Sequence, residues 1–183
     1  KKYKIECFNN FKNALNEKPD IMIISTPPHL HKEYAKKAIQ QNIHVFLEVN
    51  LLYDHVQSIL KSSKKSSSII CTSNTMRFHP VVKKLKTLVD QKKIGKIYSV
   101  HHHVGHFLPN WHPWESYNDF FVSRKETGGA KELVPVELNW LTYIFSDVRS
   151  VFANVNKISK LDVKIDDNYQ AILEFKDKIF CTL

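Results

Sequence analysis

Glycine is scarce in this chain of 183 residues: there are four, and none precedes Gly95. A loop that cradles phosphate needs several glycines at the start of a helix, so the first half of the sequence contains no such loop. Arginine is rarer still, because only Arg77, Arg124 and Arg149 occur. The formal net charge of +9 therefore comes almost wholly from lysine.

The lysines are scattered and are not interleaved with aromatic residues, which indicates a solvated surface and no nucleic-acid partner. A basic nucleic-acid module would need residues 83–93 on one exposed face with aromatics nearby. An anionic nucleotide or an acidic sugar would also suit the charge.

Cysteine is sparse too. Cys7, Cys71 and Cys181 lie far apart, and two of them are in apolar, strand-like runs, which is typical of buried thiols in a reducing compartment. No segment approaches the ~18 apolar residues of a membrane span, and no signal peptide opens the chain. We expect a cytoplasmic protein with no membrane attachment, in which both ends of the sequence are points of truncation.

The first half alternates strands with helices. Short continuous apolar runs such as residues 21–24 are typical of strands buried on both faces of a parallel sheet. Their alternation with helical segments is that of right-handed βαβ units. The expected strands are 21–24, 43–47 and 69–72, and the expected helices are 8–18, 34–39, 54–63 and 81–89.

The pattern changes near residues 92–95. From Ile97 apolar and polar residues alternate, as in a half-exposed strand of an antiparallel sheet. A helix over 133–144 and strands at 148–158, 169–175 and 179–183 are expected to follow. The sequence thus predicts an α/β chain, with a partial dinucleotide-binding, Rossmann-type domain at 1–93. An α+β domain with an open, largely antiparallel sheet is predicted at 94–183.

Polar residues follow the first two strands, where an open parallel sheet binds its ligands. Thr26 and Pro27 end the first strand, His31 begins the next helix, and Glu48 ends the second strand. These four side chains are candidates for contact with a ligand.

The spacing of these residues resembles the Gfo/Idh/MocA family of nicotinamide-dependent sugar oxidoreductases. The similar pattern is Thr26-Pro27-x-x-x-His31, then Ala35-x-x-Ala38, then His44-Val45-Phe46-x-Glu48. The resemblance implies hydride transfer between NAD or NADP and a sugar or sugar-derived alcohol. It implies cofactor contacts at Thr26, Pro27, His31, Glu48 and Arg77.

The family follows its glutamate with Lys-Pro, and that lysine helps to move the substrate's hydroxyl proton; here Val49 takes its place. The family's second proton-handling motif, Asp/Glu-x-x-x-His-x-x-Asp, corresponds to Glu132, Val136 and Asn139. Such spacing puts the three side chains on one helical face. Valine does not titrate, so two aliphatic substitutions indicate lost or rebuilt proton transfer. Alternatively, Glu132 and Asn139 are only solvent-facing or capping residues.

An aromatic segment spans residues 108–117. Rings with a few polar groups suit sugar recognition, so Trp111, His112, Trp114 and Tyr117 are candidate substrate contacts, together with Asn139. The candidate catalytic residues are His112 or Tyr117, as replacement proton carriers, and Glu132. Alternatively, the segment is a lid or an oligomer contact.

Arg77 lies in an Arg-Phe-x-Pro motif. As an alternative to a cofactor contact, it is a structural anchor between domains.

Four histidines, at 101–103 and 106, invite a metal interpretation. On a strand at most two of them converge, and no cysteine or carboxylate joins them at ligand spacing, so no metal site is predicted.

The expected partner is a sugar or sugar nucleotide, with homo-oligomerisation through the C-terminal sheet. The competing hypothesis is a non-catalytic relative that binds a sugar or nucleotide, or acts as a partner subunit.

Overall fold

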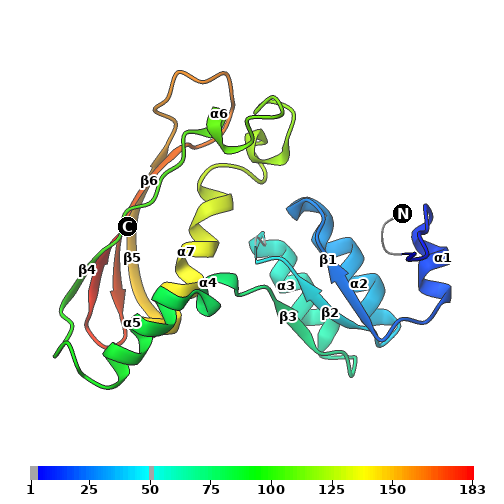
Figure 1. The fold of residues 1–183 in the computed structure, drawn as a ribbon, viewed down its shortest axis with the longest axis horizontal. Coiled ribbons are helices and arrows are strands. Elements are labelled where there is room, and N and C mark those ends of the chain that lie inside the picture. Colours follow the sequence, from blue (N-terminus) through cyan, green and yellow to red (C-terminus); the bar gives the residue numbers. More distant parts are fainter. Residues whose placement is uncertain (1–3, 50–51) are drawn as a thin grey trace. The chain divides into compact units, whose positions relative to one another are not determined.

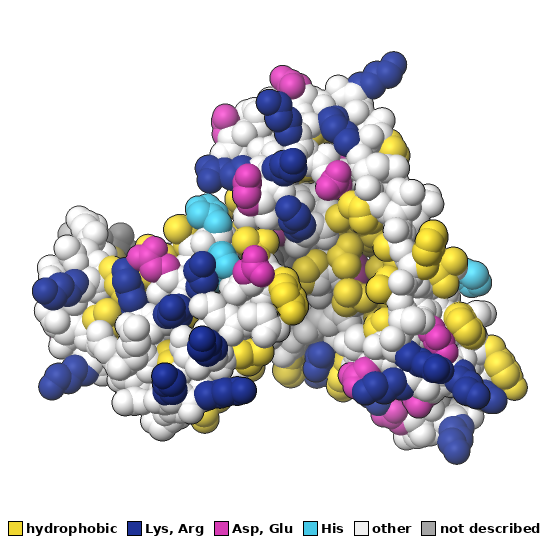
Figure 2. All heavy atoms as spheres, turned by 180° about the vertical axis from the view of Figure 1, so that it is seen from behind, with side chains coloured by type: hydrophobic (Ala, Val, Ile, Leu, Met, Phe, Trp, Pro, Cys, Tyr) yellow, Lys and Arg dark blue, Asp and Glu magenta, His cyan; other side chains and the backbone are white. Residues whose placement is uncertain are grey.

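The computed structural model describes residues 4–49 and 52–183 (Figure 1). The chain forms two compact units. The first comprises most of the chain as far as Thr72, and the second comprises Ser73–Leu183 together with two short earlier segments. No helix among the described residues is long and apolar enough to cross a membrane. Lysine and arginine side chains are spread over the face seen in Figure 2, with acidic side chains among them.

The first unit is built on a parallel sheet in the order β1-β2-β3, as the sequence predicts. The side chain of Asn10 caps its first helix by accepting a hydrogen bond from the amide of Lys12. The elements are α1 (Phe11–Asn16), β1 (Ile21–Ile24), η1 (Pro28–Leu30), α2 (His31–Gln40), β2 (His44–Leu47), α3 (Tyr53–Ser63) and β3 (Ile70–Thr72).

The strands of this unit are buried on one face only. Successive crossovers place α2 and α3 together against the same side, where Ile24, Val45 and Leu47 are buried with the helical residues Ala35, Ala38, Ile39 and Ile59. Alternate strand residues point the other way, and Ile21 and Ile23 are 59% and 73% exposed. The prediction of strands buried on both faces was therefore wrong here, as was that of a buried Cys71 thiol.

The second unit carries a mixed sheet in the order β4-β7-β6-β5. β5, β6 and β7 pair antiparallel, whereas β4 pairs parallel with β7, which corrects the antiparallel expectation for residues 97–104. The elements are α4 (Thr75–Phe78), α5 (Pro80–Asp90), β4 (Ser99–His101), α6 (Leu108–Trp111), η2 (Phe121–Ser123), α7 (Ala130–Phe145), β5 (Val148–Asn156), β6 (Asn168–Phe175) and β7 (Phe180–Thr182).

Helices α5 and α7 pack on one face of this sheet (Figure 1). The shared core consists of Val82, Leu141, Ile144, Phe145, Leu173, Phe175, Ile179 and Cys181. The predicted boundary at residue 93 would assign α5 to the first domain, although α5 contributes Val82 to this core. That boundary stays a prediction.

A smaller core lies beneath the loops at the start of α7 and contains Leu108, Val122, Val163 and Ile165. Two glycines allow the backbone of these loops to lie directly against the start of α7. A Cβ on Gly128 would lie 1.6 Å from the carbonyl oxygen of Val122, and Gly129 has φ +62° and lies against the backbone of Asp166. Only glycine fits both positions, so this pair fixes where α7 begins.

Candidate functional site

The first group of candidate residues lies at the carboxyl ends of β1 and β2. Ser25 Oγ donates to Glu48 Oε1 at 3.0 Å, which ties the two strand ends together. His31 is completely buried, and its Nε2 donates to the carbonyl oxygen of Thr26 at 2.6 Å. The hydroxyl of Thr26 is buried and has no hydrogen-bond partner among the described residues. This end of the sheet thus has a rigid frame and one polar atom left to bind something else.

Val49, at the position of the family's lysine, is half-buried. Its amide donates to Ser73 Oγ at 3.1 Å. The next residue of the predicted motif, Asn50, lies outside the described residues. Pro27 precedes η1, and its predicted cofactor contact, like that of Glu48, stays a prediction.

Helix α7 carries Glu132, Val136 and Asn139, the residues predicted to correspond to the family's second proton-handling motif. Glu132 is 7% exposed, so the alternative that it merely faces solvent was wrong. Val136 is half-buried one turn further along. Asn139 Oδ1 and its backbone oxygen both accept hydrogen bonds from Arg77, and Asn139 Nδ2 donates to Asn74 Oδ1 at 2.6 Å.

Arg77 also lies over the ring of Tyr143, with its Cζ 5.1 Å from the ring centre. These contacts attach α4 to α7 within the second unit. The alternative that Arg77 is a structural anchor between the domains stays a prediction. The role of Arg77 toward the cofactor stays a prediction.

The aromatic segment forms a stack around His112. The ring of His112 lies between Trp114, at 4.8 Å and 20°, and Phe120, at 4.3 Å and 21°. Its Nδ1 donates to Glu115 Oε1 at 2.6 Å. A histidine held in this way by its Nδ1 has its Nε2 left to contact a bound molecule.

Trp111 lies beside this stack, edge-on to both His112 and Phe120, and stacks on His106 at 5.5 Å. Trp114 is 75% exposed, so its outer face is open to a ligand. Tyr117 is half-buried against the smaller core and is not part of the stack. The structure therefore brings two of the predicted residues, Trp111 and Trp114, into contact with a third, His112, and leaves Tyr117 apart from them.

Four participants were missed by reasoning from sequence: Glu115, Phe120, His106 and Asn74. Glu115 follows His112 by three residues, a spacing that could have suggested the pair. Phe120 and His106 come from segments on either side, and no local pattern marks them.

Two histidines of the run 101–103 have structural partners. His102 Nε2 lies 2.6 Å from Glu137 Oε2, which also accepts from Trp140 Nε1 at 2.8 Å. His101 Nδ1 lies 2.8 Å from Thr182 Oγ1. No cluster of three or more histidine, cysteine or acidic side chains that could hold a metal is found in residues 4–49 and 52–183. Burial raises the pKa of the Cys181 thiol, which keeps it protonated and unreactive.

The family models match both units. Residues 82–183 match the GFO/IDH/MocA C-terminal domain, and residues 1–73 match the oxidoreductase family with an NAD-binding Rossmann fold. A fold of this kind defines a class of two-domain nicotinamide-dependent oxidoreductases. The chain belongs to the GFO/IDH/MocA family.

Curated relatives cover parts of the chain. The 2,7-anhydro-N-acetylneuraminate hydratase of Escherichia coli (strain K12) is 32% identical over 84 residues, which are 45% of this chain and 23% of the relative. Oxidoreductase P35 of Formosa agariphila is 27% identical over 129 residues, or 69% of this chain and 34% of the relative. The chain thus spans less than half the length of these relatives.

Solved structures share the fold. An NAD-binding protein from Listeria innocua has a TM-score of 0.82 at 21% identity and covers 99% of this chain and 51% of its own. The WlbA dehydrogenase from Bordetella pertussis, in complex with NADH and UDP-GlcNAcA, has a TM-score of 0.77 at 17% identity, covering 96% and 51%. Myo-inositol 2-dehydrogenase from Lactobacillus plantarum has a TM-score of 0.79 at 19% identity, covering 96% and 53%.

Proposed function

We propose that the chain is part of an NAD- or NADP-dependent oxidoreductase that transfers hydride between the cofactor and a hydroxyl-bearing carbon of a sugar or sugar-derived alcohol. The observation that supports this is the His112–Glu115 pair within the aromatic stack, because it joins a titratable group to a sugar-binding surface. The sugar-nucleotide and inositol ligands named for structural relatives support the substrate class.

The carboxyl ends of β1 and β2 fit the nicotinamide end of the cofactor. The buried, unpartnered hydroxyl of Thr26 would bind its polar groups, and Glu48, His31 and Pro27 would frame it. Arg77 is the further candidate contact. The bound cofactor supplies the hydride chemistry, and the protein supplies position and proton transfer.

His112 would act on the substrate's hydroxyl. Its Nε2 takes the hydroxyl proton when the alcohol is oxidised and returns it in the reverse reaction. Glu115 fixes the orientation of the ring through Nδ1. Trp111 and Trp114 would bind the C–H faces of the sugar, with Tyr117, Glu132 and Asn139 as further contacts.

The competing proposal is a non-catalytic relative that binds a sugar or nucleotide. It is favoured by Val49 and Val136, two aliphatic residues at the family's proton-handling positions. Neither valine can exchange a proton. Unless His112 takes over proton transfer, the chain would therefore bind its ligand without catalysing a reaction.

Turnover by the full-length gene product decides between the two. Inositols, sugar acids and nucleotide sugars would be assayed with both cofactors, in wild type and in His112→Gln and His103→Gln variants. His103 is an exposed histidine outside the aromatic segment and serves as the control. We expect His112→Gln to lower turnover by ~10²- to 10⁴-fold and His103→Gln to leave it unchanged. Ligand binding without turnover in the wild type would establish the competing proposal.

Cofactor affinity tests whether the residues of this chain are enough to bind the nicotinamide cofactor. Because no glycine precedes Gly95, the chain has no glycine-rich turn for the pyrophosphate, and we expect it to bind NADH and NADPH weakly or not at all. Calorimetric titration of the chain measures this. Micromolar affinity would show that other residues cradle the phosphates.

We also propose self-association through the open face of the second sheet. Phe152, Ile172 and Phe180 are 73%, 51% and 52% exposed there, and Phe152 is directly opposite Ile172 in the register. Such an exposed apolar face marks an interaction surface.

A cytoplasmic location is proposed in addition, since the three cysteines are all free.

A further inference from the structure

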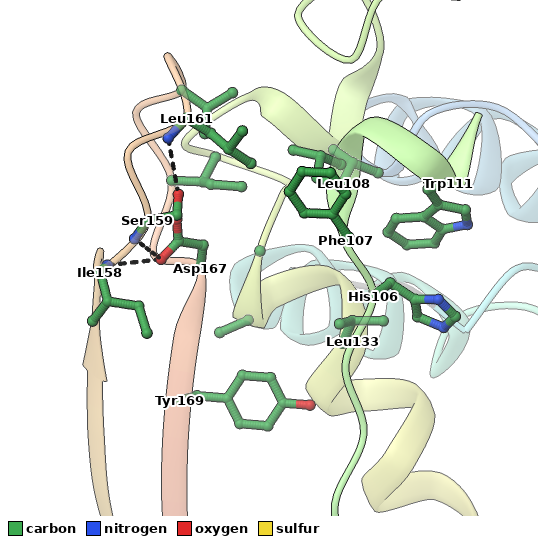
Figure 3. Close-up of a pocket in the computed structure, with 15 residues that line it drawn as sticks. His106, Phe107, Leu108, Trp111, Leu133, Ile158, Ser159, Leu161, Asp167 and Tyr169 are labelled. Carbon is green, nitrogen blue, oxygen red and sulfur yellow. Dashed lines mark hydrogen bonds between the residues drawn. The ribbon is translucent and has the colours of Figure 1, made fainter. Parts of the chain in front are cut away.

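A cavity of about 220 Å³ lies in the second unit beneath the loop that joins β5 to β6 (Figure 3). Helix α7 lines it through Gly129, Ala130 and Leu133, while Glu132 and Val136 do not contribute to its wall. It is therefore distinct from the proton-handling motif on the same helix. The wall is mainly apolar, and its other members include Phe107, Leu108, Val122, Ile158, Leu161, Val163 and Ile165.

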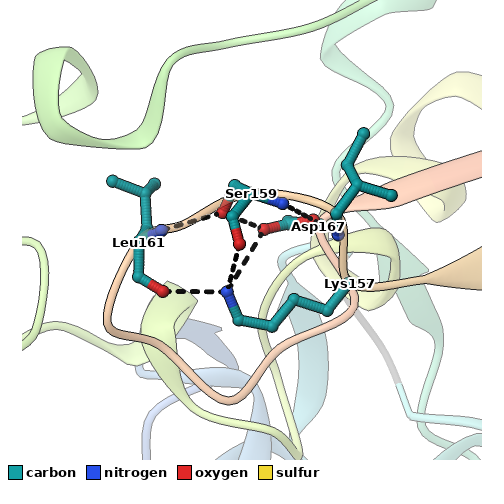
Figure 4. Close-up of polar contacts among 5 residues, drawn as sticks. Lys157, Ser159, Leu161 and Asp167 are labelled. Carbon is teal, nitrogen blue, oxygen red and sulfur yellow. Dashed lines mark hydrogen bonds and ion pairs between the residues drawn. The ribbon is translucent and has the colours of Figure 1, made fainter.

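The one acidic group in the cavity wall is already satisfied. Asp167 accepts hydrogen bonds from the amides of Ile158, at 2.8 Å, and Ser159, at 3.3 Å, and from the Ser159 hydroxyl. Lys157 Nζ lies 3.9 Å from the carboxylate and donates to the carbonyl oxygens of Ser159 and Leu161 (Figure 4). This arrangement closes the loop, and it leaves no uncompensated charge that would select an ionic ligand.

The hydroxyl of Tyr169 is not satisfied. Tyr169 stands at the start of β6 and points across the base of the cavity toward α7 (Figure 3). Its Oη is buried and has no hydrogen-bond partner in the described part of the chain. Burial and the nearby negative charge of Glu137 raise the pKa of Tyr169, so the hydroxyl is protonated and can donate. A buried donor without a partner is destabilising, and one that opens on a cavity is a binding group.

The size and lining of the cavity define the occupant. An apolar cavity of about 150 Å³ lined by aliphatic and aromatic side chains stays dry and binds benzene. This cavity is larger and mainly apolar, and the polar members of its wall are His106, Ser159, Asp167 and Tyr169. Of these, the Tyr169 hydroxyl is the buried polar atom without a partner among the described residues. We propose that it is a binding site for an uncharged six-membered aromatic ring carrying one hydroxyl, with Tyr169 Oη as its hydrogen-bond partner.

Trp111 links this cavity to the aromatic stack. It lines the cavity and also lies edge-on to His112, so an occupant would contact a residue of the candidate active site. Occupancy would then be detected by the fluorescence of Trp111, in a chain that has three tryptophans. The proposal concerns binding alone and stands whether or not the chain is catalytic.

Phenol and benzene are the probes, titrated into the chain and followed by saturation-transfer NMR. In the wild type phenol should bind more tightly than benzene. Tyr169→Phe removes only the hydroxyl, so we expect phenol to bind about fivefold more weakly and benzene to be unaffected. The same variant should melt at a higher temperature without ligand, because it removes an unpartnered buried donor.

Two further variants complete the experiment. Leu133→Trp fills the cavity and should abolish binding of both probes, whereas Tyr98→Phe removes a hydroxyl from a tyrosine that is 67% exposed and should change nothing. Failure of phenol to bind the wild type, or tighter binding of benzene than of phenol, would overturn the proposal. So would a Tyr169→Phe chain that melts lower and binds phenol as tightly as the wild type, since its hydroxyl would then already have a partner.

Discussion

Arg77 and Asn139 form a two-point contact in which the guanidinium donates through Nε to the side-chain oxygen of Asn139 and through Nη2 to its backbone oxygen, both at 3.0 Å. Asn74 fixes the orientation of the same amide by accepting from Asn139 Nδ2. A short helix is thereby attached to the middle of α7. Asn139, which the sequence predicts to take the last position of the family's proton-handling motif, is thus engaged in a structural contact.

Replacing Arg77 by lysine should weaken this joint. Lysine cannot donate in the planar, two-point geometry of a guanidinium, so the free energy of unfolding should fall by about 1–2 kcal/mol. Urea denaturation measures the loss. The control is Arg149→Lys, because Arg149 forms an exposed ion pair with Glu174 and should lose less than ~0.5 kcal/mol. Equal losses in both variants would refute the anchoring role.

Restoring the two proton-handling groups should restore family chemistry if the substrate site is intact. In the full-length gene product, Val49→Lys with Val136→His should raise dehydrogenase turnover by ~10²- to 10⁴-fold, the usual contribution of general acid-base catalysis. Each single change should give much less, because positioning and proton transfer act together. Val134→His, a half-buried valine on the same helix two residues away, is the control. A wild-type enzyme that already depends on His112 would instead show that the mechanism was rebuilt.

The loop between β5 and β6 should loosen in acid. Burial opposes ionisation of Asp167, but hydrogen bonds from Ser159 and the amides of Ile158 and Ser159, with the charge of Lys157, outweigh it and lower the pKa of Asp167. A carboxyl with a lowered pKa stabilises the fold above its unfolded pKa of about 3.9, and this contribution is lost as the pH falls through the folded pKa.

Asp167→Asn tests this argument. At pH 7 the variant should be less stable by about 1–2 kcal/mol in urea denaturation, and the difference from the wild type should shrink as the pH falls below about 4. Asp162→Asn, in an exposed position of the same loop, should change little. A difference that persists unchanged in strong acid would show that packing, and not the charge, is responsible.

The open face of the second sheet should control self-association. Phe152→Glu with Ile172→Lys places opposite charges on directly paired residues, which keeps the sheet intact and removes exposed apolar surface. Sedimentation velocity should show a shift toward the monomer. Leu60→Lys, at a residue of the first unit that is 50% exposed, is the control for a general gain in solubility.

The same experiment distinguishes association through this face from association through the edge strand β1. Ile21 and Ile23 are also exposed, on an edge strand of the parallel sheet, and edge strands are templates for pairing. If the Phe152 and Ile172 substitutions leave the chain associated, Ile23→Lys should disperse it. A monomeric wild-type chain would contradict both expectations.

The order of the elements could be predicted from the sequence because it depends on local patterns. Ile21–Ile24 was predicted as a strand and is one, and the alternation of strands and helices through Asp90 follows from hydrophobic runs and periodicity. The prediction that the strands of the first unit are buried on both faces was wrong. An apolar run does not say whether both faces of a strand are covered, which depends on where the crossover helices pack.

The sequence by itself determined the family pattern and the lack of glycine before Gly95, and it predicted that Val49 and Val136 take the family's proton-handling positions, since each depends on residue identity and spacing. Only the tertiary structure decided that His112 lies between Trp114 and Phe120, that Arg77 binds Asn139, and that the hydroxyl of Tyr169 opens on a cavity. These contacts join segments that are far apart in the chain or lie in irregular loops. Their geometry is fixed by packing, which no local pattern encodes.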